Sequence, residues 1–249
     1  MSSKSLLERQ KDLVEFLCDP RAFKASPGTQ QTSSPIPGID GARLKLIGEQ
    51  ALQKRFEKIR AVLPKSFDVM GSDIGPLFED FAHRYPPSHI GRLENARQFV
   101  EFVSERRHSS PFYSPFLTDL LKFEFALWSA RFDQKSGRDG GARDKRQKEF
   151  RSSRMVCLAH SVQLLLLNHD IRPLLEHSGN KESIRPRKTY LAIRFDAELD
   201  DVRIFEVSRK IYEILNGLSR PSRVGEETLA SQSDILQELA ERGIVTWLQ

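Results

Sequence analysis

The hydrophobic residues of this chain repeat with a helical period before residue 134 and with a shorter period after residue 154. Between these stretches, residues 134–154 contain eight basic and three acidic side chains, and the first eight of these residues include no apolar side chain. A charged, glycine-containing tract of this kind cannot bury enough apolar surface to fold by itself. The chain is therefore predicted to form two domains, at residues 1–133 and 155–249, joined by a basic flexible linker at residues 134–154.

The first domain is predicted to be helical. Its apolar residues recur every three or four positions, which is the spacing of one buried face of a helix. Pro64 indicates the end of one helix, Asp73 is a candidate N-cap, and Ser114-Pro115 is a typical helix start. The expected helices cover residues 5–17, 41–63, 73–85, 92–106 and 114–128.

Residues 155–249 combine strand and helix patterns. Residues 188–195 alternate between polar and apolar side chains, and Asp200-Asp201 forms a turn before the next apolar stretch, so a β-hairpin is predicted. The apolar run at residues 155–167 fits a third strand, with a buried helix as the alternative. Three short helices and a final apolar strand or tail are expected at residues 208–215, 222–230, 233–243 and 244–248. This order of elements is typical of a winged-helix-like unit, so the predicted fold class is α+β.

The sequence contains no arrangement typical of an active site or a metal centre. The six histidines form no His-x-x-x-His or His-x-His pair, which metal ligands on one helix face need. The glycines at 137, 140 and 141 lie in a charged tract without a preceding strand, so they do not indicate a phosphate-binding loop. A binding protein is therefore favoured over an enzyme, and no catalytic residue, metal ligand or cofactor is assigned.

The expected location is the cytoplasm, away from membranes. The chain has no run of about 18 apolar residues that could span a bilayer, and its N-terminus lacks the apolar stretch of a signal peptide. Cys18 and Cys157 are far apart in the sequence and lie in apolar contexts. They are predicted to be free, buried thiols in a reducing compartment.

The charge distribution bears on the partner of the C-terminal domain. The net charge is +5, but residues 134–188 carry the basic excess and residues 189–249 carry more acidic than basic side chains. Two readings of the domain remain, in which its third helix enters a DNA major groove or a peptide pairs along the edge of a strand. Asp234, Glu238 and Glu241 make that helix acidic, which disfavours contact with phosphates and indicates a peptide that carries Lys or Arg.

The candidate peptide-binding site therefore combines a strand edge with one face of the third helix. The strand supplies backbone groups for pairing, and the helix supplies an apolar wall. The predicted site residues are Val202, Arg203, Ile204, Phe205, Glu206, Val207, Leu236, Leu239 and Ala240.

Both parts of the chain resemble one family of proteins. In the C-terminal part, residues 190–195, 202–206, 211–217 and 234–245 resemble the peptide-recognition element of ribosomal-peptide biosynthesis. In the N-terminal part, residues 55–67, 78–87, 93–102 and 115–128 resemble the helical domain of partner subunits of multinuclear non-haem iron-dependent oxidases. Such partners occur in methanobactin and 3-thiaglutamate biosynthesis, and the two-part layout is most similar to the 3-thiaglutamate type.

This resemblance implies a non-catalytic subunit with an oxidase-docking domain at residues 1–133 and a winged-helix-like peptide-recognition domain at residues 155–249, built from a three-stranded sheet plus three helices. The implied partners are the leader of a precursor peptide and an iron-dependent oxidase, which would form a heterodimer with this chain and hold the iron. The implied reaction, in the oxidase, is excision of the β-carbon of a cysteine. A DNA-binding transcriptional regulator is the alternative function, and an enzyme in its own right is the third.

Overall fold

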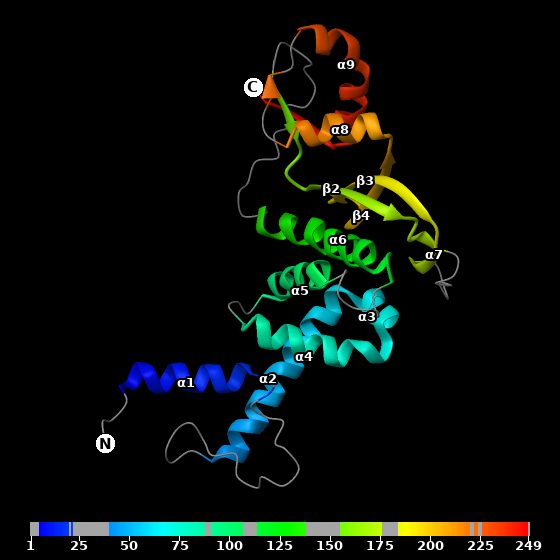
Figure 1. The fold of residues 1–249 in the computed structure, drawn as a ribbon. Helices are drawn as coiled ribbons and strands as arrows, with labels where there is room; N and C mark the ends of the chain where they lie inside the picture. Colours follow the sequence, from blue (N-terminus) through cyan, green and yellow to red (C-terminus); the bar gives the residue numbers. More distant parts are fainter. Residues whose placement is uncertain are drawn as a thin grey trace. The chain divides into compact units, whose positions relative to one another are not determined.

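The computed structural model describes most of the chain, as two compact units, Met1–Phe125 and Ala126–Gln249 (Figure 1). The boundary between the units falls inside helix α6, Leu117–Gly137, so this helix enters the segment that was predicted to be a linker. Residues 138–154, the rest of that segment, lie outside the described residues. The described residues are 5–19, 21, 40–87, 91–106, 114–137, 155–175, 184–219, 222–223 and 226–248.

The first unit is helical, as predicted, and each of the five expected helices is present. It also contains a helix that the sequence analysis missed, because Pro64 was read as a stop signal. Pro64 is instead the first residue of this helix, where its missing N–H group is not needed. The elements are α1 (Leu6–Cys18), α2 (Gly41–Val62), α3 (Pro64–Met70), the 3₁₀ helix η2 (Gly71–Asp73), α4 (Ile74–Arg84), α5 (Arg92–Arg106) and the first part of α6.

The predicted N-cap at Asp73 is wrong. Its side chain makes no capping hydrogen bond, and its backbone has helical dihedral angles of −76° and −14°. The physical reason is that η2 leads directly into α4, whereas a capping residue needs an extended backbone to reach back to the first turn. By contrast, Asp40 does cap α2, because its side chain accepts a hydrogen bond from the Ala42 N–H at 2.9 Å.

An aromatic cluster forms the core of the helical unit. Phe81 lies at its centre, with ring centroids 5.2 Å from Phe99 and 5.5 Å from Phe102. The guanidinium of Arg55 is buried against this cluster, 4.5 Å from the Phe81 centroid. It donates to Asn95 Oδ1 at 2.7 Å and to the Tyr85 carbonyl at 2.6 Å, both neutral acceptors. Burial lowers the pKa of Arg55 to about 10.

A buried carboxylate from α6 caps the start of α3. Glu124 Oε1 accepts a hydrogen bond from the Lys65 N–H at 2.8 Å, and Oε2 accepts from the N–H and the hydroxyl of Ser66 at 2.8 and 2.6 Å. The residue before α3, Leu63, has no side chain that could do this. Glu124 therefore satisfies helix donors that would otherwise be buried without a partner.

The stability of the helical unit should depend on pH through Glu124. Burial raises the pKa of Glu124 above its ordinary value of 4.5, although the hydrogen bonds from Ser66 and Lys65 oppose this rise. At pH values between the ordinary pKa of the unfolded state and the raised pKa of the folded state, the folded state binds more protons than the unfolded state. The free energy of unfolding should therefore fall as pH rises through this range. The measurement is urea unfolding of the wild type and Glu124→Gln at several pH values from about 4 to about 7. A stability difference that is constant over this range would contradict the prediction.

The second unit contains two small antiparallel sheets and is α+β, as predicted. The sheets have the strand orders β5-β1-β6 and β2-β3-β4. The predicted hairpin is confirmed: β3 and β4 pair from Tyr190–Val207 to Asp196–Asp201, and Asp200 in the turn has a φ of 50°. The elements are β1 (Met155–Leu158), β2 (Val162–His169), α7 (Arg172–Leu175), β3 (Pro186–Asp196), β4 (Asp201–Val207), α8 (Arg209–Gly217), β5 (Ser222–Arg223), α9 (Glu226–Glu241) and β6 (Val245–Leu248).

The later helices of this unit differ from the prediction. Instead of two helices at residues 222–230 and 233–243, the chain forms the short strand β5 and then one continuous helix, α9. Residues 226–241 contain no Pro or Gly to break the helix, so Ser233, the first residue of the second predicted helix, lies inside α9. The strand predicted at residues 155–167 is two strands, β1 and β2, which belong to different sheets. The structure therefore has two sheets where one three-stranded sheet was predicted.

The helix expected at residues 208–215 is present as α8. Ser208 Oγ accepts a hydrogen bond from the Ile211 N–H at 3.3 Å, and the helix ends at Gly217. The hydrophobic core beneath α8 and α9 joins residues of both sheets. Its buried members are Val156, Val162, Ala192, Leu215, Leu218, Leu236, Leu239, Ile244 and Val245.

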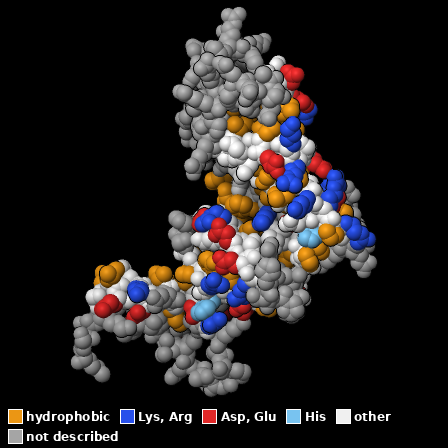
Figure 2. All heavy atoms as spheres, turned by 45° about the horizontal axis from the view of Figure 1, so that its top comes forward, with side chains coloured by type: hydrophobic (Ala, Val, Ile, Leu, Met, Phe, Trp, Pro, Cys, Tyr) orange, Lys and Arg blue, Asp and Glu red, His pale blue; other side chains and the backbone are white. Residues whose placement is uncertain are grey.

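The surface of α1 is unusually apolar. Leu6 and Leu7 are 74% and 75% exposed, and Figure 2 shows hydrophobic side chains at the surface of this helix. The helical stripe predicted at residues 5–17 is therefore present, but its first half is not buried in the described structure. Within the described residues, no helix combines the length and the apolar character that a membrane span requires.

Candidate functional site

Strand β4 lies at the edge of its sheet. In the described part of the chain it pairs with β3 only, so its second row of backbone N–H and C=O groups has no strand partner there. Successive side chains of a strand point to opposite faces. Phe205 and Val207 pack against the core beneath α8 and α9, and Arg203 lies on the same face by register. Ile204 points to the other face and is 46% exposed.

A groove of about 430 Å³ runs along this edge. One wall is β4 from Ile204 to Val207, and the other is formed by α8 and α9. Most of the residues that line the helical wall are apolar, and Glu238 and Arg242 lie at its rim. The helical wall and the turn after α9 contribute Ile211, Ile235, Glu238, Leu239, Arg242 and Ile244.

The structure brings most of the predicted site residues together. Ile204, Phe205, Glu206, Val207 and Leu239 line the groove. Arg203 and Ala240 line the pocket next to it.

Two predicted site residues lie elsewhere. Leu236 is 2% exposed and belongs to the core. Val202 lines neither cavity, because the groove borders β4 only from Ile204 to Val207 and the neighbouring pocket includes Arg203 but not Val202.

The sequence analysis missed the contributions of Ile211 and Arg242 to the groove and of Arg194 to the neighbouring pocket. No local pattern indicates the place of Arg194, because it depends on the packing of β3 against the turn after α9.

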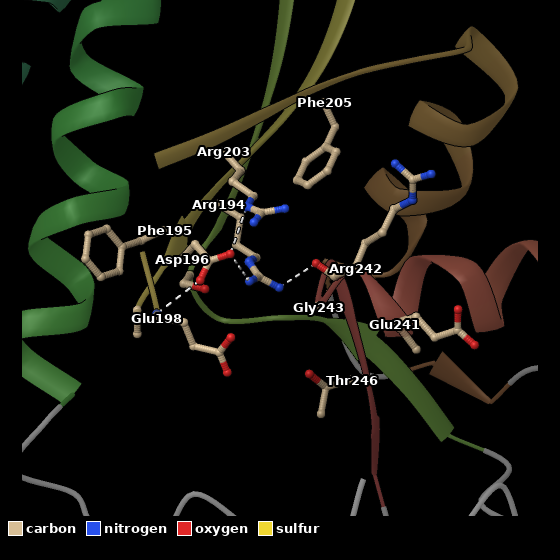
Figure 3. A pocket seen from close by; sticks show the side chains of 13 residues that line it. Arg194, Phe195, Asp196, Glu198, Arg203, Phe205, Glu241, Arg242, Gly243 and Thr246 are labelled. Atoms are coloured by element: carbon tan, nitrogen blue, oxygen red, sulfur yellow. Dashed lines mark hydrogen bonds and ion pairs between the residues drawn. The ribbon is translucent and has the colours of Figure 1, made fainter. Parts of the chain in front are cut away.

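The neighbouring pocket, of about 930 Å³, is polar (Figure 3). Arg194, Arg203 and Arg242 line it, and the first two converge on Asp196. Asp196 Oδ2 lies 2.8 Å from Arg203 Nε and 3.3 Å from Arg194 Nη2. Arg242 extends over the Phe205 ring, with its Cζ 5.9 Å from the centroid, and donates to Glu238 Oε1 at 2.6 Å.

The turn after α9 brings the two walls together. The Gly243 N–H donates to the Ala240 carbonyl and the Ile244 N–H donates to the Leu239 carbonyl, both at 2.8 Å, which is a Schellman motif. Gly243 has the required φ of 64°. Arg194 Nη1 donates to the Arg242 carbonyl across this turn, so β3 is tied to the end of α9.

The described residues contain no cluster of three or more His, Cys, Asp or Glu side chains that could hold a metal ion. Cys18 and Cys157 are free thiols, as predicted, but they are half-buried and not fully buried. Burial raises the pKa of the Cys18 thiol, which opposes formation of a reactive thiolate. The candidate site thus combines a strand edge, an apolar wall and a cluster of arginines.

Comparison with models of known protein families and with curated proteins gave no match to this sequence.

Proposed function

We propose that this chain is a non-catalytic partner protein that binds the leader of a ribosomally made precursor peptide along β4. The observation that carries the proposal is the edge of β4, which has no strand partner in the described structure and borders an apolar groove. A peptide added as a strand would satisfy these backbone groups, and its alternate side chains would enter the groove. In this proposal the β3–β4 hairpin and α9 act as a winged-helix-like peptide-recognition element.

The charge of α9 supports a peptide over DNA. The helix contains five acidic residues and no basic residue. A helix in a DNA groove gains affinity by releasing counterions from phosphates, and an acidic helix does the reverse. The acidic α9 therefore disfavours the alternative of a DNA-binding regulator.

The proposal assigns the helical unit to docking on a multinuclear iron-dependent oxidase, which would hold the iron and perform the oxidation. The support is the resemblance of residues 55–67, 78–87, 93–102 and 115–128 to the helical domain of such partners. By the same resemblance, the substrate is a precursor peptide whose cysteine loses its β-carbon in the cytoplasm, as in 3-thiaglutamate biosynthesis. The exposed apolar side chains of α1 provide surface for such an interface.

The test is proline substitution on β4. The probe is a fluorescein-labelled peptide, selected on the full chain from a display library of random peptides, and its affinity is measured by fluorescence anisotropy. Ile204→Pro should weaken binding about tenfold or more, because proline removes a backbone donor and disrupts the strand. Ile204→Thr is the matched control: it keeps the N–H, and its side chain points away from the core face, so it should bind normally.

Circular dichroism should show that both variants remain folded. If folded Ile204→Pro binds the selected peptide as tightly as the wild type does, the peptide does not pair with β4 and the proposed function is wrong.

A further inference from the structure

The apolar groove and the polar pocket are parts of one continuous depression. Phe205 and Arg242 line both, so a strand paired with β4 would pass from the groove into the pocket. Along β4, the groove lies beside Val207 and Phe205, and the pocket lies beside Arg203. The chemistry that a bound peptide meets therefore changes along its length from apolar side chains to charged ones, among them three arginines and the carboxylates of Asp196, Glu198 and Glu241.

The arginines of the pocket retain unused hydrogen-bond donors. A guanidinium has five N–H donors. Among the described residues, Arg203 uses its Nε on Asp196, and Arg242 uses its Nη2 on Glu238. The Nε of Arg194 has no hydrogen-bond partner in the described structure, but it is buried and does not serve an incoming ligand. One carboxylate, Asp196, is thus shared between two guanidiniums, which leaves donors for an incoming acceptor.

Asp196 and Glu198 line the pocket, and three further acidic residues near the depression are paired or point away from Arg194 and Arg203. Glu206 Oε1 accepts from Arg187 Nη2 at 2.7 Å, and Glu238 accepts from Arg242. In Figure 3 the carboxylate of Glu241 points away from Arg194 and Arg203. The sequence expectation of a basic leader rested on the charge of α9 alone, and it did not include the arginines that β3, β4 and the turn after α9 bring together.

The register of a strand on β4 follows from sheet geometry. Residues directly opposite each other on neighbouring strands project from the same face. The peptide residues opposite Val207 and Phe205 would therefore face the apolar wall formed by α8 and α9. The residue opposite Arg203, two positions further along, would face the guanidiniums.

From this register we infer that the peptide bound on β4 carries two alternating apolar residues followed, two positions later, by an acidic residue whose carboxylate binds Arg203 and Arg242. The inference rests on the proposed function and specifies the chemistry of its ligand. Because purely antiparallel sheets are common, we expect the peptide to run antiparallel to β4 and to meet Val207 first and Arg203 last. The order from its N-terminus to its C-terminus is then apolar–x–apolar–x–acidic. The carboxylate would accept charge-assisted hydrogen bonds in a partly enclosed pocket.

The experiment is display selection of random twelve-residue peptides on the full chain, performed in parallel with wild type, Arg203→Glu and the control Arg209→Gln. Arg209 lies on α8, pairs with Glu213 and lines neither cavity. Wild type and Arg209→Gln should enrich Asp or Glu two positions from the apolar pair. Arg203→Glu should lose this preference or select Lys or Arg there.

A selected peptide in which that acidic residue is replaced by its amide should bind about five- to tenfold more weakly, as expected for loss of a charge-assisted hydrogen bond. Arg242→Gln provides a second variant in case Arg203→Glu does not fold. Peptides that lose affinity for Ile204→Pro but show no acidic preference would overturn this inference and leave the proposed function intact. Failure to select peptides sensitive to Ile204→Pro would overturn both.

Discussion

Replacing Glu124 by leucine is expected to lower the free energy of unfolding of the helical unit by about 3 kcal/mol, because two buried donors of Ser66 and the partly buried N–H of Lys65 lose their acceptor. Leucine fills similar space but accepts no hydrogen bond from Lys65 or Ser66. Removing a buried carboxylate offsets part of this cost. The expected fall in melting temperature, about 10 °C, can be measured by circular dichroism at a wavelength that reports helix.

The matched control for this variant is Glu101→Leu. Glu101 lies on α5, is half-exposed and contacts Arg97 at the surface, so its replacement should change stability by less than about 0.5 kcal/mol. Glu124→Gln, which keeps one acceptor oxygen, should fall between the wild type and Glu124→Leu. If Glu124→Leu and Glu101→Leu melt at the same temperature, Glu124 does not cap α3 in the folded protein.

Gly243→Ala is expected to destabilise the second unit by about 2–3 kcal/mol. A φ of 64° alone costs an L-residue about 1–2 kcal/mol. A Cβ at this position would also overlap Arg194 Nη1, so the guanidinium would have to leave the Arg242 carbonyl. Because this bond ties β3 to the end of α9, peptide affinity should fall together with stability. Thermal unfolding and the anisotropy assay measure these two effects.

Two comparisons separate the backbone strain at position 243 from the steric overlap between the added Cβ and Arg194. Gly217→Ala is the matched control, since a Cβ there would meet no atom within 4 Å, and it should be close to neutral. In an Arg194→Ala background, Gly243→Ala should cost only the backbone strain, which a double-mutant cycle detects as coupling between the two positions. Strictly additive effects would mean that Arg194 does not lie against Gly243.

Local patterns predicted the elements of the site well. The alternation at residues 188–195 and the turn at Asp200-Asp201 predicted the β3–β4 hairpin, because a strand with one buried face needs a period of two. Ser208 caps the start of α8 and Gly243 follows the end of α9, and both signals are local because capping depends on neighbouring residues. The predicted break inside α9 was wrong, since Ser and Asp are tolerated in a helix interior when tertiary packing supports it.

The sequence by itself thus determined most of the helices and the β3–β4 hairpin, that the chain mixes a helical part with an α+β part, and which strand and helix residues are candidates for binding a peptide. Only the tertiary structure decided that Glu124 caps a helix 58 residues earlier and that Arg194 reaches the Arg242 carbonyl 48 residues later. Helix caps and strand alternation depend on residues within a few positions, whereas these contacts depend on how distant elements pack. The arginine pocket beside the groove also depends on the packing of distant elements, because β3, β4 and the turn after α9 each contribute one of its guanidiniums.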